Sequence, residues 1–198
     1  PEGKGEGDNK VGGSAMAKVA IILAEGFEEV EAIAPIDVLR RAGVEVIIAG
    51  LTPEPVASAR NVKIVPDTTV DNLKPEELDM VILPGGAGGV ERLKQDPRVE
   101  RLIKAMQEKK KLIGAICAAP TALAKFGVLE GKRATVYPSL VEEIKPAHFV
   151  DQPVVEDENI VTSQGPGTAL EFGLKLAEKL VGKEKAMEVA QRMLVRYQ

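Results

Sequence analysis

The 198-residue chain has few of the residues that build disulfides, metal centres or membrane spans. One cysteine and one histidine exclude an intramolecular disulfide and a structural zinc site, which needs about four such ligands. No apolar run approaches the roughly 18 residues of a transmembrane helix. The net charge of −4 lacks the basic surplus of a nucleic-acid-binding protein. We therefore expect no metal, no membrane and no specific nucleic acid, and the single cysteine indicates a reducing, cytoplasmic location.

The first sixteen residues differ from the rest of the chain. They hold five of the nineteen glycines and follow neither a helix nor a strand period. Such a segment buries too little apolar surface to offset its ordering entropy. It looks like an added tail joined to a natural start at Met16. We expect residues 1–16 to be disordered and residues 17–198 to form a single domain.

The body of the chain alternates short apolar runs with helical patterns. The runs are nearly all apolar, as in strands that are covered on both faces of a parallel sheet. They lie at Lys18–Ala24, Val44–Gly50, Asp79–Leu83, Lys111–Ile116 and Asn159–Ser163, with shorter edge-like strands at Val62–Val65 and Ala134–Tyr137. Helices are predicted at Glu28–Arg41, Pro97–Lys109, from a Thr168/Glu171 capping box to about Val181, and at Glu184–Val195. This order predicts a three-layer α/β sandwich with a mainly parallel sheet.

Glycines follow the third of these strands, at the edge of the sheet where ligands bind. The loop is not a dinucleotide fingerprint, because Glu91 stands where G-x-G-x-x-G would need its last glycine. No G-K-[ST] follows any glycine cluster either. Gly85 and Gly86 instead expose backbone N–H groups that could hold a developing oxyanion. A tight turn that simply needs glycine is the alternative.

Cys117 is the candidate nucleophile, at the junction of a buried strand and a helix that opens with small residues. A side chain at such an elbow points outward, and a helix N-terminus favours the thiolate. A buried structural cysteine explains the position equally well. Without a G-x-S-x-G motif, a serine hydrolase is disfavoured.

Glu31 lies in the first turn of the first predicted helix, where acidic residues ordinarily complement the helix dipole. A carboxyl buried there would tend to be protonated and could donate a hydrogen bond to a thiolate. His148 is the sole imidazole, and we interpret it as an ordinary loop residue rather than a catalytic base. Before any family is considered, we interpret Arg41 and Arg60 as ordinary solvated surface residues.

Four segments, in the same order along the chain, resemble the ThiJ/PfpI superfamily: Lys18–Arg41, Val81–Gly86, Ala115–Pro120 and Thr162–Phe172. The most similar branch contains the parkinsonism-associated deglycases and bacterial YajL. The resemblance implies a flavodoxin-like α/β/α sandwich, related to class I glutamine amidotransferases. It also implies a homodimer and no cofactor.

The resemblance assigns the central residues of the site. Cys117 matches the reactive cysteine of the family, and Glu31 matches the carboxyl that hydrogen-bonds its sulfur and steadies its sulfinate form. Gly86 and Ala118, with Gly85 beside them, match the backbone donors that line an anion pocket.

The resemblance also shows two departures. Tyr137 stands where the animal branch has a histidine beside the cysteine, which puts a Cys–His pair in doubt. Ala118 replaces the histidine that follows the cysteine in PfpI-type peptidases, which disfavours peptidase activity.

Arg41 and Arg60 match arginines near the site, where the dimer interface approaches it.

By this resemblance the chain is expected to be a cysteine-dependent enzyme acting on reactive carbonyls. It would convert methylglyoxal to lactate without glutathione, clear glycated protein adducts, or do both. The alternative is an oxidative-stress sensor or redox-regulated chaperone that uses the same cysteine. An inactive scaffold is a third interpretation. The sequence does not separate the first two, because both need an activated thiol.

Overall fold

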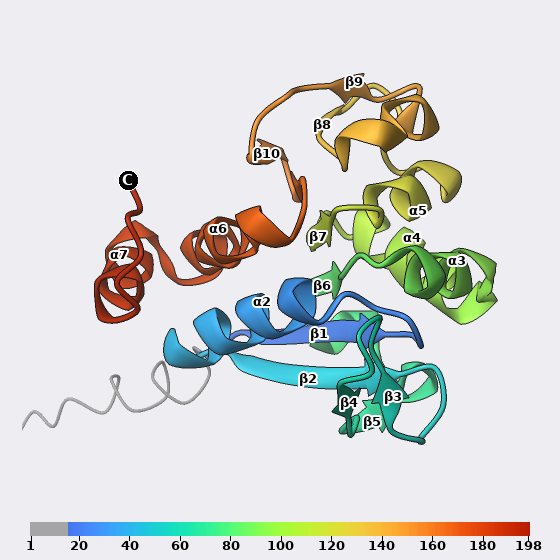
Figure 1. Ribbon diagram of the computed structural model, residues 1–198, viewed down its shortest axis with the longest axis horizontal. Coiled ribbons are helices and arrows are strands. Elements are labelled where there is room, and N and C mark those ends of the chain that lie inside the picture. The colour runs from blue at the N-terminus through green and yellow to red at the C-terminus, as the bar shows by residue number, and fades with distance from the viewer. Residues whose placement is uncertain (1–15) are drawn as a thin grey trace, which may run out of the picture.

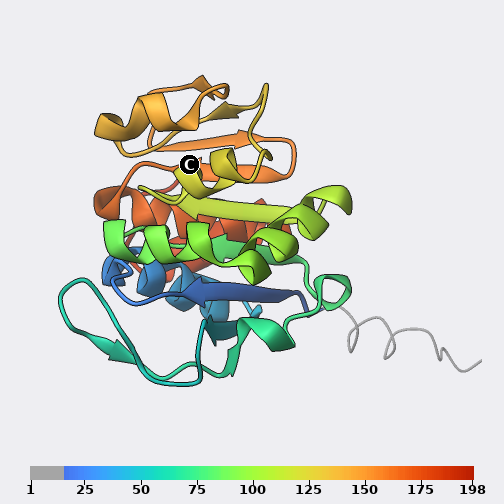
Figure 2. The same ribbon diagram turned by 90° about the vertical axis from the view of Figure 1, so that its right-hand side faces the viewer.

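The computed structural model describes residues 16–198, so residues 1–15 of the predicted disordered tail lie outside the described residues. A seven-stranded sheet with the order β10-β11-β7-β6-β1-β2-β5 has helices on both faces (Figures 1 and 2). The predicted apolar runs form its parallel centre: β1 (Lys18–Leu23), β2 (Glu45–Gly50), β6 (Met80–Leu83), β7 (Leu112–Ile116) and β11 (Ile160–Ser163). The central order β2-β1-β6-β7-β11 is that of flavodoxin, which confirms the expected fold.

Two edge strands complete the sheet: β5 (Thr68–Thr69) is parallel to β2, and β10 (Val154–Asp157) is antiparallel to β11. The predicted edge-like strands at 62–65 and 134–137 were wrong in extent and place. Both contribute to separate two-stranded sheets, which pair β3 (Val56–Ala57) with β4 (Lys63–Ile64) and β8 (Arg133–Ala134) with β9 (His148–Phe149). The second strand stops at Ala134 because the next backbone groups bond elsewhere: Thr135 N–H donates to the Thr162 hydroxyl oxygen and Tyr137 N–H donates to the Cys117 carbonyl.

The helices form two layers that lie on opposite faces of the sheet (Figure 1). One layer holds α2 (Glu29–Arg41), α6 (Ala169–Val181) and α7 (Lys183–Arg192), and the other holds α3 (Ala87–Gln95), α4 (Pro97–Glu108) and α5 (Pro120–Lys125). Short 3-10 helices lie at Val70–Asn72, Pro75–Glu77, Pro138–Ile144 and Pro166–Thr168. No helix within residues 16–198 has the length and apolarity to cross a membrane.

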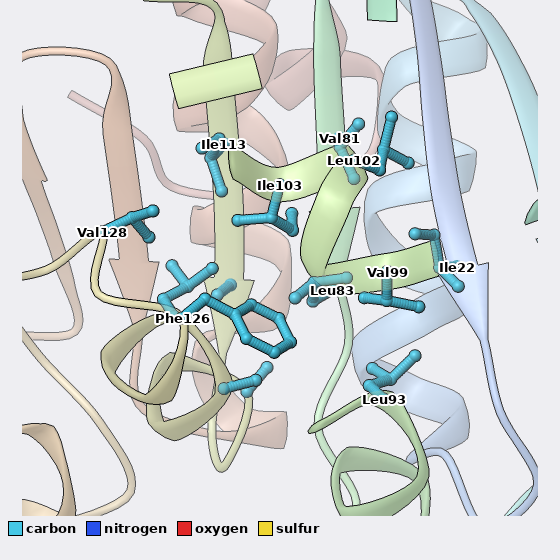
Figure 3. Close-up of a cluster of buried hydrophobic side chains, with 14 of the residues drawn as sticks. Ile22, Val81, Leu83, Leu93, Val99, Leu102, Ile103, Ile113, Phe126 and Val128 are labelled. Atoms are coloured by element: carbon cyan, nitrogen blue, oxygen red, sulfur yellow. The ribbon is translucent and has the colours of Figure 1, made fainter. Parts of the chain in front are cut away.

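Each central strand is buried on both faces, which explains its continuous apolar sequence. In β1, Ile21 belongs to the cluster under α2 and α6, whereas Ile22 belongs to the cluster under α3 and α4. Figure 3 shows the second cluster, in which Ile103 lies near Ile113 of β7 and Phe126 lies near Leu83 of β6. The sheet is therefore held rigidly between two cores, and its carboxyl edge can position side chains accurately.

The predicted capping box of α6 does not form. Thr168 makes no side-chain capping bond to the helix. Its hydroxyl instead accepts a hydrogen bond from Gly165 N–H at 3.1 Å and lies 2.7 Å from the Ser163 hydroxyl. The Thr168 hydroxyl is therefore used in the turn before α6 and does not cap the helix.

Candidate active site

Loops that follow β1, β6 and β7 meet at one point of the carboxyl edge. The chain leaves β1 through α2 on one face and leaves β6 through α3 on the other, so this is the topological switch point where such sheets bind ligands. Glu28 N–H donates to Gly85 O at 2.8 Å and joins the first two loops. Cys117 N–H donates to Ser163 O at 2.9 Å and anchors the third.

Cys117 occupies a strained elbow. Its φ of 65° lies in the left-handed region, which costs a residue other than glycine about 1–3 kcal/mol. Tyr137 N–H donates to the Cys117 carbonyl at 2.9 Å and holds this conformation. The small Ala118 and Ala119 that follow are buried. The elbow predicted from the small residues is thus present, and it turns the half-buried sulfur toward Glu31.

Glu31 is completely buried in the first turn of α2. Its Oε1 accepts a hydrogen bond from Gly85 N–H at 3.0 Å. Its Oε2 receives no hydrogen bond from a nitrogen or hydroxyl donor in residues 16–198. A Cβ on Gly85 would meet both Glu31 Oε1 and the Cys117 Cβ, so the carboxyl and the thiol lie side by side as a buried acid–thiol pair.

Burial sets the protonation of this pair. Burial raises the pKa of Glu31 to about 7, and the Glu28 charge raises it further. The Cys117 thiol and the Gly85 N–H lower it, but by less than burial raises it. Burial, followed by the charge of Glu31, raises the pKa of the Cys117 thiol to about 12. The sequence predicted the opposite direction for Cys117. The helix after it is only six residues long and begins at Pro120, so its dipole is outweighed by burial beside a carboxylate.

The backbone donors divide into two kinds. Gly85 N–H is already bonded to Glu31, so the prediction that it faces an oxyanion is wrong and its amide positions the carboxyl instead. Ala118 N–H hydrogen-bonds the Cys117 sulfur. This bond lowers the pKa of the thiol, but burial and Glu31 outweigh it. Gly86 N–H meets no acceptor among residues 16–198, and its φ of 99° requires glycine. Gly86 N–H is therefore unpaired within the described residues, whereas Ala118 N–H is bonded to the sulfur.

The other predicted residues fall in different places. Tyr137 is 46% exposed, and a Cβ on Gly165 would lie 3.7 Å from its ring, so it flanks the site. Arg60 lies 4.0 Å from acidic residues of the site. Arg41 is at the far end of α2 from Glu31, about 15 Å along the helix, and pairs with Asp37. His148 is exposed in β9, where its N–H donates to the Lys132 carbonyl at 2.7 Å.

Sequence reasoning missed the acidic residues beside Glu31. Glu28 caps α2 by accepting Glu31 N–H at 2.9 Å. Glu29 accepts hydrogen bonds from the Ser58 hydroxyl at 3.1 Å and from Arg60 N–H at 3.0 Å. The run of glutamates was visible, but its contacts with residues 58–60 come from tertiary packing. Within the described chain, no group of three or more His, Cys, Asp and Glu side chains is arranged to hold a metal.

Comparisons with known proteins agree with this geometry. The DJ-1/PfpI family matches residues 17–179. Protein dj-1beta of Drosophila melanogaster is 48% identical over 92% of this chain and 100% of its own length. The crystal structure of that fly protein superposes with a TM-score of 0.89 at 47% identity, and it covers 92% of this chain and 100% of the other.

A third similarity concerns a named activity. The glutathione-independent glyoxalase DJR-1.2 of Caenorhabditis elegans is 39% identical over 86% of this chain and 93% of its own length. These matches span nearly the whole of the described fold and include the elbow and the segment that carries Glu31. The chain belongs to the DJ-1/PfpI family.

Proposed function

We propose that this chain is a cofactor-independent enzyme that uses Cys117 and Glu31 to convert reactive dicarbonyls such as methylglyoxal to hydroxy acids. The observation that carries the proposal is the buried Glu31–Cys117 pair, with Ala118 N–H on the sulfur and a Gly86 N–H that has no acceptor among residues 16–198. The similarity to a glutathione-independent glyoxalase supports the same reaction class.

The first step forms a bond between sulfur and the aldehyde carbon. Glu31, with a pKa near neutrality, takes the thiol proton as Cys117 Sγ attacks. The aldehyde oxygen becomes an alkoxide, which accepts hydrogen bonds from Gly86 and Ala118. The proton then passes from Glu31 to that oxygen and completes a hemithioacetal. Because the resting thiol is protonated, the thiolate forms only when a substrate is in place.

The second stage moves a hydrogen without an external oxidant. Glu31 removes the proton from the former aldehyde carbon and returns it to the neighbouring carbon. The hemithioacetal hydroxyl loses its proton and becomes the thioester carbonyl, and the neighbouring ketone oxygen takes up that proton and becomes a hydroxyl. The product is a lactoyl thioester on Cys117. Water hydrolyses the thioester to lactate and restores the thiol, so methylglyoxal plus water gives lactate plus a proton. Early glycation adducts on proteins contain the same carbonyl-derived carbons and are proposed as further substrates.

The test is lactate formation from methylglyoxal without glutathione or added metal. We expect Cys117→Ala to abolish it and Glu31→Gln to lower kcat by about 100-fold or more, the usual contribution of a general base. Glu25→Gln changes an exposed carboxyl after β1 and is the matched control. Equal rates in wild type and Cys117→Ala would overturn the proposal.

A redox-sensing role is the second candidate. Cys117 has no second cysteine with which to form an intramolecular disulfide, so its oxidation would proceed to a sulfinic acid beside Glu31. The raised pKa of the thiol, caused by burial and Glu31, slows that oxidation at neutral pH. Modest peroxide should add two oxygen atoms to Cys117 in the wild type. The fraction of protein that carries this modification should be smaller in Glu31→Leu. Oxidation confined to methionines would exclude the sensor.

We further propose a homodimer that forms through α2 and the β3–β4 hairpin, and a cytoplasmic location. Four apolar side chains are exposed on these elements: Val30, Ile33, Val62 and Val65. Beside them an open cavity of about 650 Å³ is lined largely by isoleucines and includes Arg41. An exposed apolar face of this kind typically marks a protein interface. Sedimentation velocity should show a dimer, and a monomer at all concentrations would refute this.

A further inference from the structure

The start of α2 concentrates three carboxyl groups around one cation. Glu28, Glu29 and Glu31 lie within the N-cap and first turn, and Glu31 is fully buried. In residues 16–198, the only cationic side chain paired with any of them is Arg60, which is itself 72% exposed. One cation compensates three crowded carboxylates only in part, so the cluster favours retaining protons.

Glu28 is built into the site by two hydrogen bonds. Its N–H donates to the Gly85 carbonyl at 2.8 Å, and the N–H of the same Gly85 holds Glu31. Its Oε2 accepts Glu31 N–H at 2.9 Å, while its Oε1 lies 4.0 Å from Arg60 Nη1. The Glu28 carboxyl is therefore held next to Glu31, and it cannot move away when its charge changes.

Glu29 has one satisfied oxygen and one orphan. Oε1 accepts from Ser58 and from the Arg60 backbone, whereas the buried Oε2 meets no hydrogen-bond donor within the described residues. Glu28 Oε1 and Glu29 Oε2 each lie 4.0 Å from the same atom, Arg60 Nη1, so the two carboxyls converge on one point, and two carboxyls can hydrogen-bond only when they share a proton. Burial and then Glu29 raise the pKa of Glu28. For Glu29, burial is outweighed by hydrogen bonds that lower its pKa.

We propose that Glu28 and Glu29 form an acid–carboxylate pair, clamped by Arg60 and Ser58, which controls when Glu31 holds its proton. Glu28 and Arg60 are positioning residues in this scheme, because neither touches the reacting sulfur. When the pair keeps its proton, Glu31 is free to ionise and act as a base. When the pair loses that proton, its second negative charge drives a proton onto Glu31. The inference rests on the proposed function, in which Glu31 is that base.

Within residues 16–198 of one subunit, the charged and titratable groups near Glu31 come from three elements. Its own helix contributes Glu28 and Glu29, the β3–β4 hairpin contributes Arg60, and the elbow contributes the Cys117 thiol. From the β6–α3 loop only the neutral Gly85 N–H reaches it. Changes in Glu28 or Arg60 therefore act on Glu31 by charge, with opposite signs.

The experiment is a carbon-13 NMR titration of the glutamate carboxyls, which does not depend on turnover. Glu28→Gln imitates the protonated acid, since its amide oxygen can cap Glu31 N–H and its amide nitrogen can donate to Glu29. We expect this variant to lower the Glu31 midpoint by about half a pH unit or more. Arg60→Gln should raise the midpoint, and Arg60→Lys should restore it.

The controls separate this inference from the proposed function. Glu25→Gln, at an exposed carboxyl outside the cluster, should leave the Glu31 midpoint in place. Circular dichroism of Glu28→Gln checks that α2 is retained. A Glu31 midpoint that moves in neither Glu28→Gln nor Arg60→Gln overturns the inference. Shifted midpoints in a protein without methylglyoxal turnover would support the inference and refute the function.

Discussion

Burial of Glu31 makes the stability of the folded protein depend on pH. Its pKa rises from the ordinary value of 4.5 to about 7, chiefly through burial. Because one pKa unit corresponds to about 1.4 kcal/mol, ionising this residue costs the folded state about 3 kcal/mol. The raised value means that its contribution is fully favourable below pH 4.5 and is lost as pH rises through 7.

Replacing Glu31 with glutamine removes this dependence. Glutamine keeps an oxygen for the Gly85 N–H and cannot ionise, so it copies the protonated acid. We expect wild type and Glu31→Gln to have similar free energies of unfolding near pH 4.5. Near pH 8 the variant should be more stable by up to about 3 kcal/mol.

The assay is urea unfolding of both proteins at several pH values between 4.5 and 8. Titrating groups that do not interact with Glu31 act on both proteins and cancel in the difference between them. Glu25→Gln is the control and should track wild type throughout, since its carboxyl is exposed. A difference between wild type and Glu31→Gln that stays constant across the range would refute the burial argument.

Three further predictions concern the surroundings of the pair. In Gly85→Ala the added Cβ would lie 2.7 Å from the Cys117 Cβ, so we expect methylglyoxal turnover to fall about 100-fold, and steady-state rates above a tenth of wild type would contradict this. Tyr137→Ala should raise KM for methylglyoxal more than it lowers kcat. Tyr137→Phe should match wild type, because the hydroxyl makes no hydrogen bond within residues 16–198. A lower kcat in Tyr137→Phe would instead make that hydroxyl a proton donor. Ile33→Glu should give a monomer in sedimentation velocity, while Met187→Glu, at an exposed apolar residue of α7, should not; a dimer in both would place the interface elsewhere.

The central strands were predictable because burial on both faces leaves a simple signature, a continuous apolar run. The helix α3 was not predicted, since Gly88 and Gly89 lower intrinsic helix propensity. Its packing explains them: a Cβ on Gly89 would lie 2.9 Å from the Phe27 backbone. Strand β10 was also missed, although Glu158 and Asn159 between two β-rich runs were a usable hairpin signal.

The meeting of Cys117, Glu31 and Gly85 at one edge of the sheet was predictable, and their electrostatics were not. The small residues after Cys117 indicated an elbow, and the positive φ is observed. The bond between Gly85 and Glu31 joins residues far apart in the chain, so no local pattern could show that this amide is occupied. The rise in the pKa of Cys117 likewise depends on burial and on Glu31, which reach the sulfur only in the folded protein.

The central claim is that Cys117 forms a covalent bond with the carbonyl substrate while Glu31 takes its proton. The most direct test mixes wild type with excess methylglyoxal, quenches in acid within one turnover and measures the mass of the Cys117 peptide. The account predicts an adduct of one methylglyoxal on Cys117 that precedes lactate, forms slowly in Glu31→Gln and is absent in Cys117→Ala. Lactate released by wild type with no adduct on Cys117, or by Cys117→Ala at the wild-type rate, would contradict it.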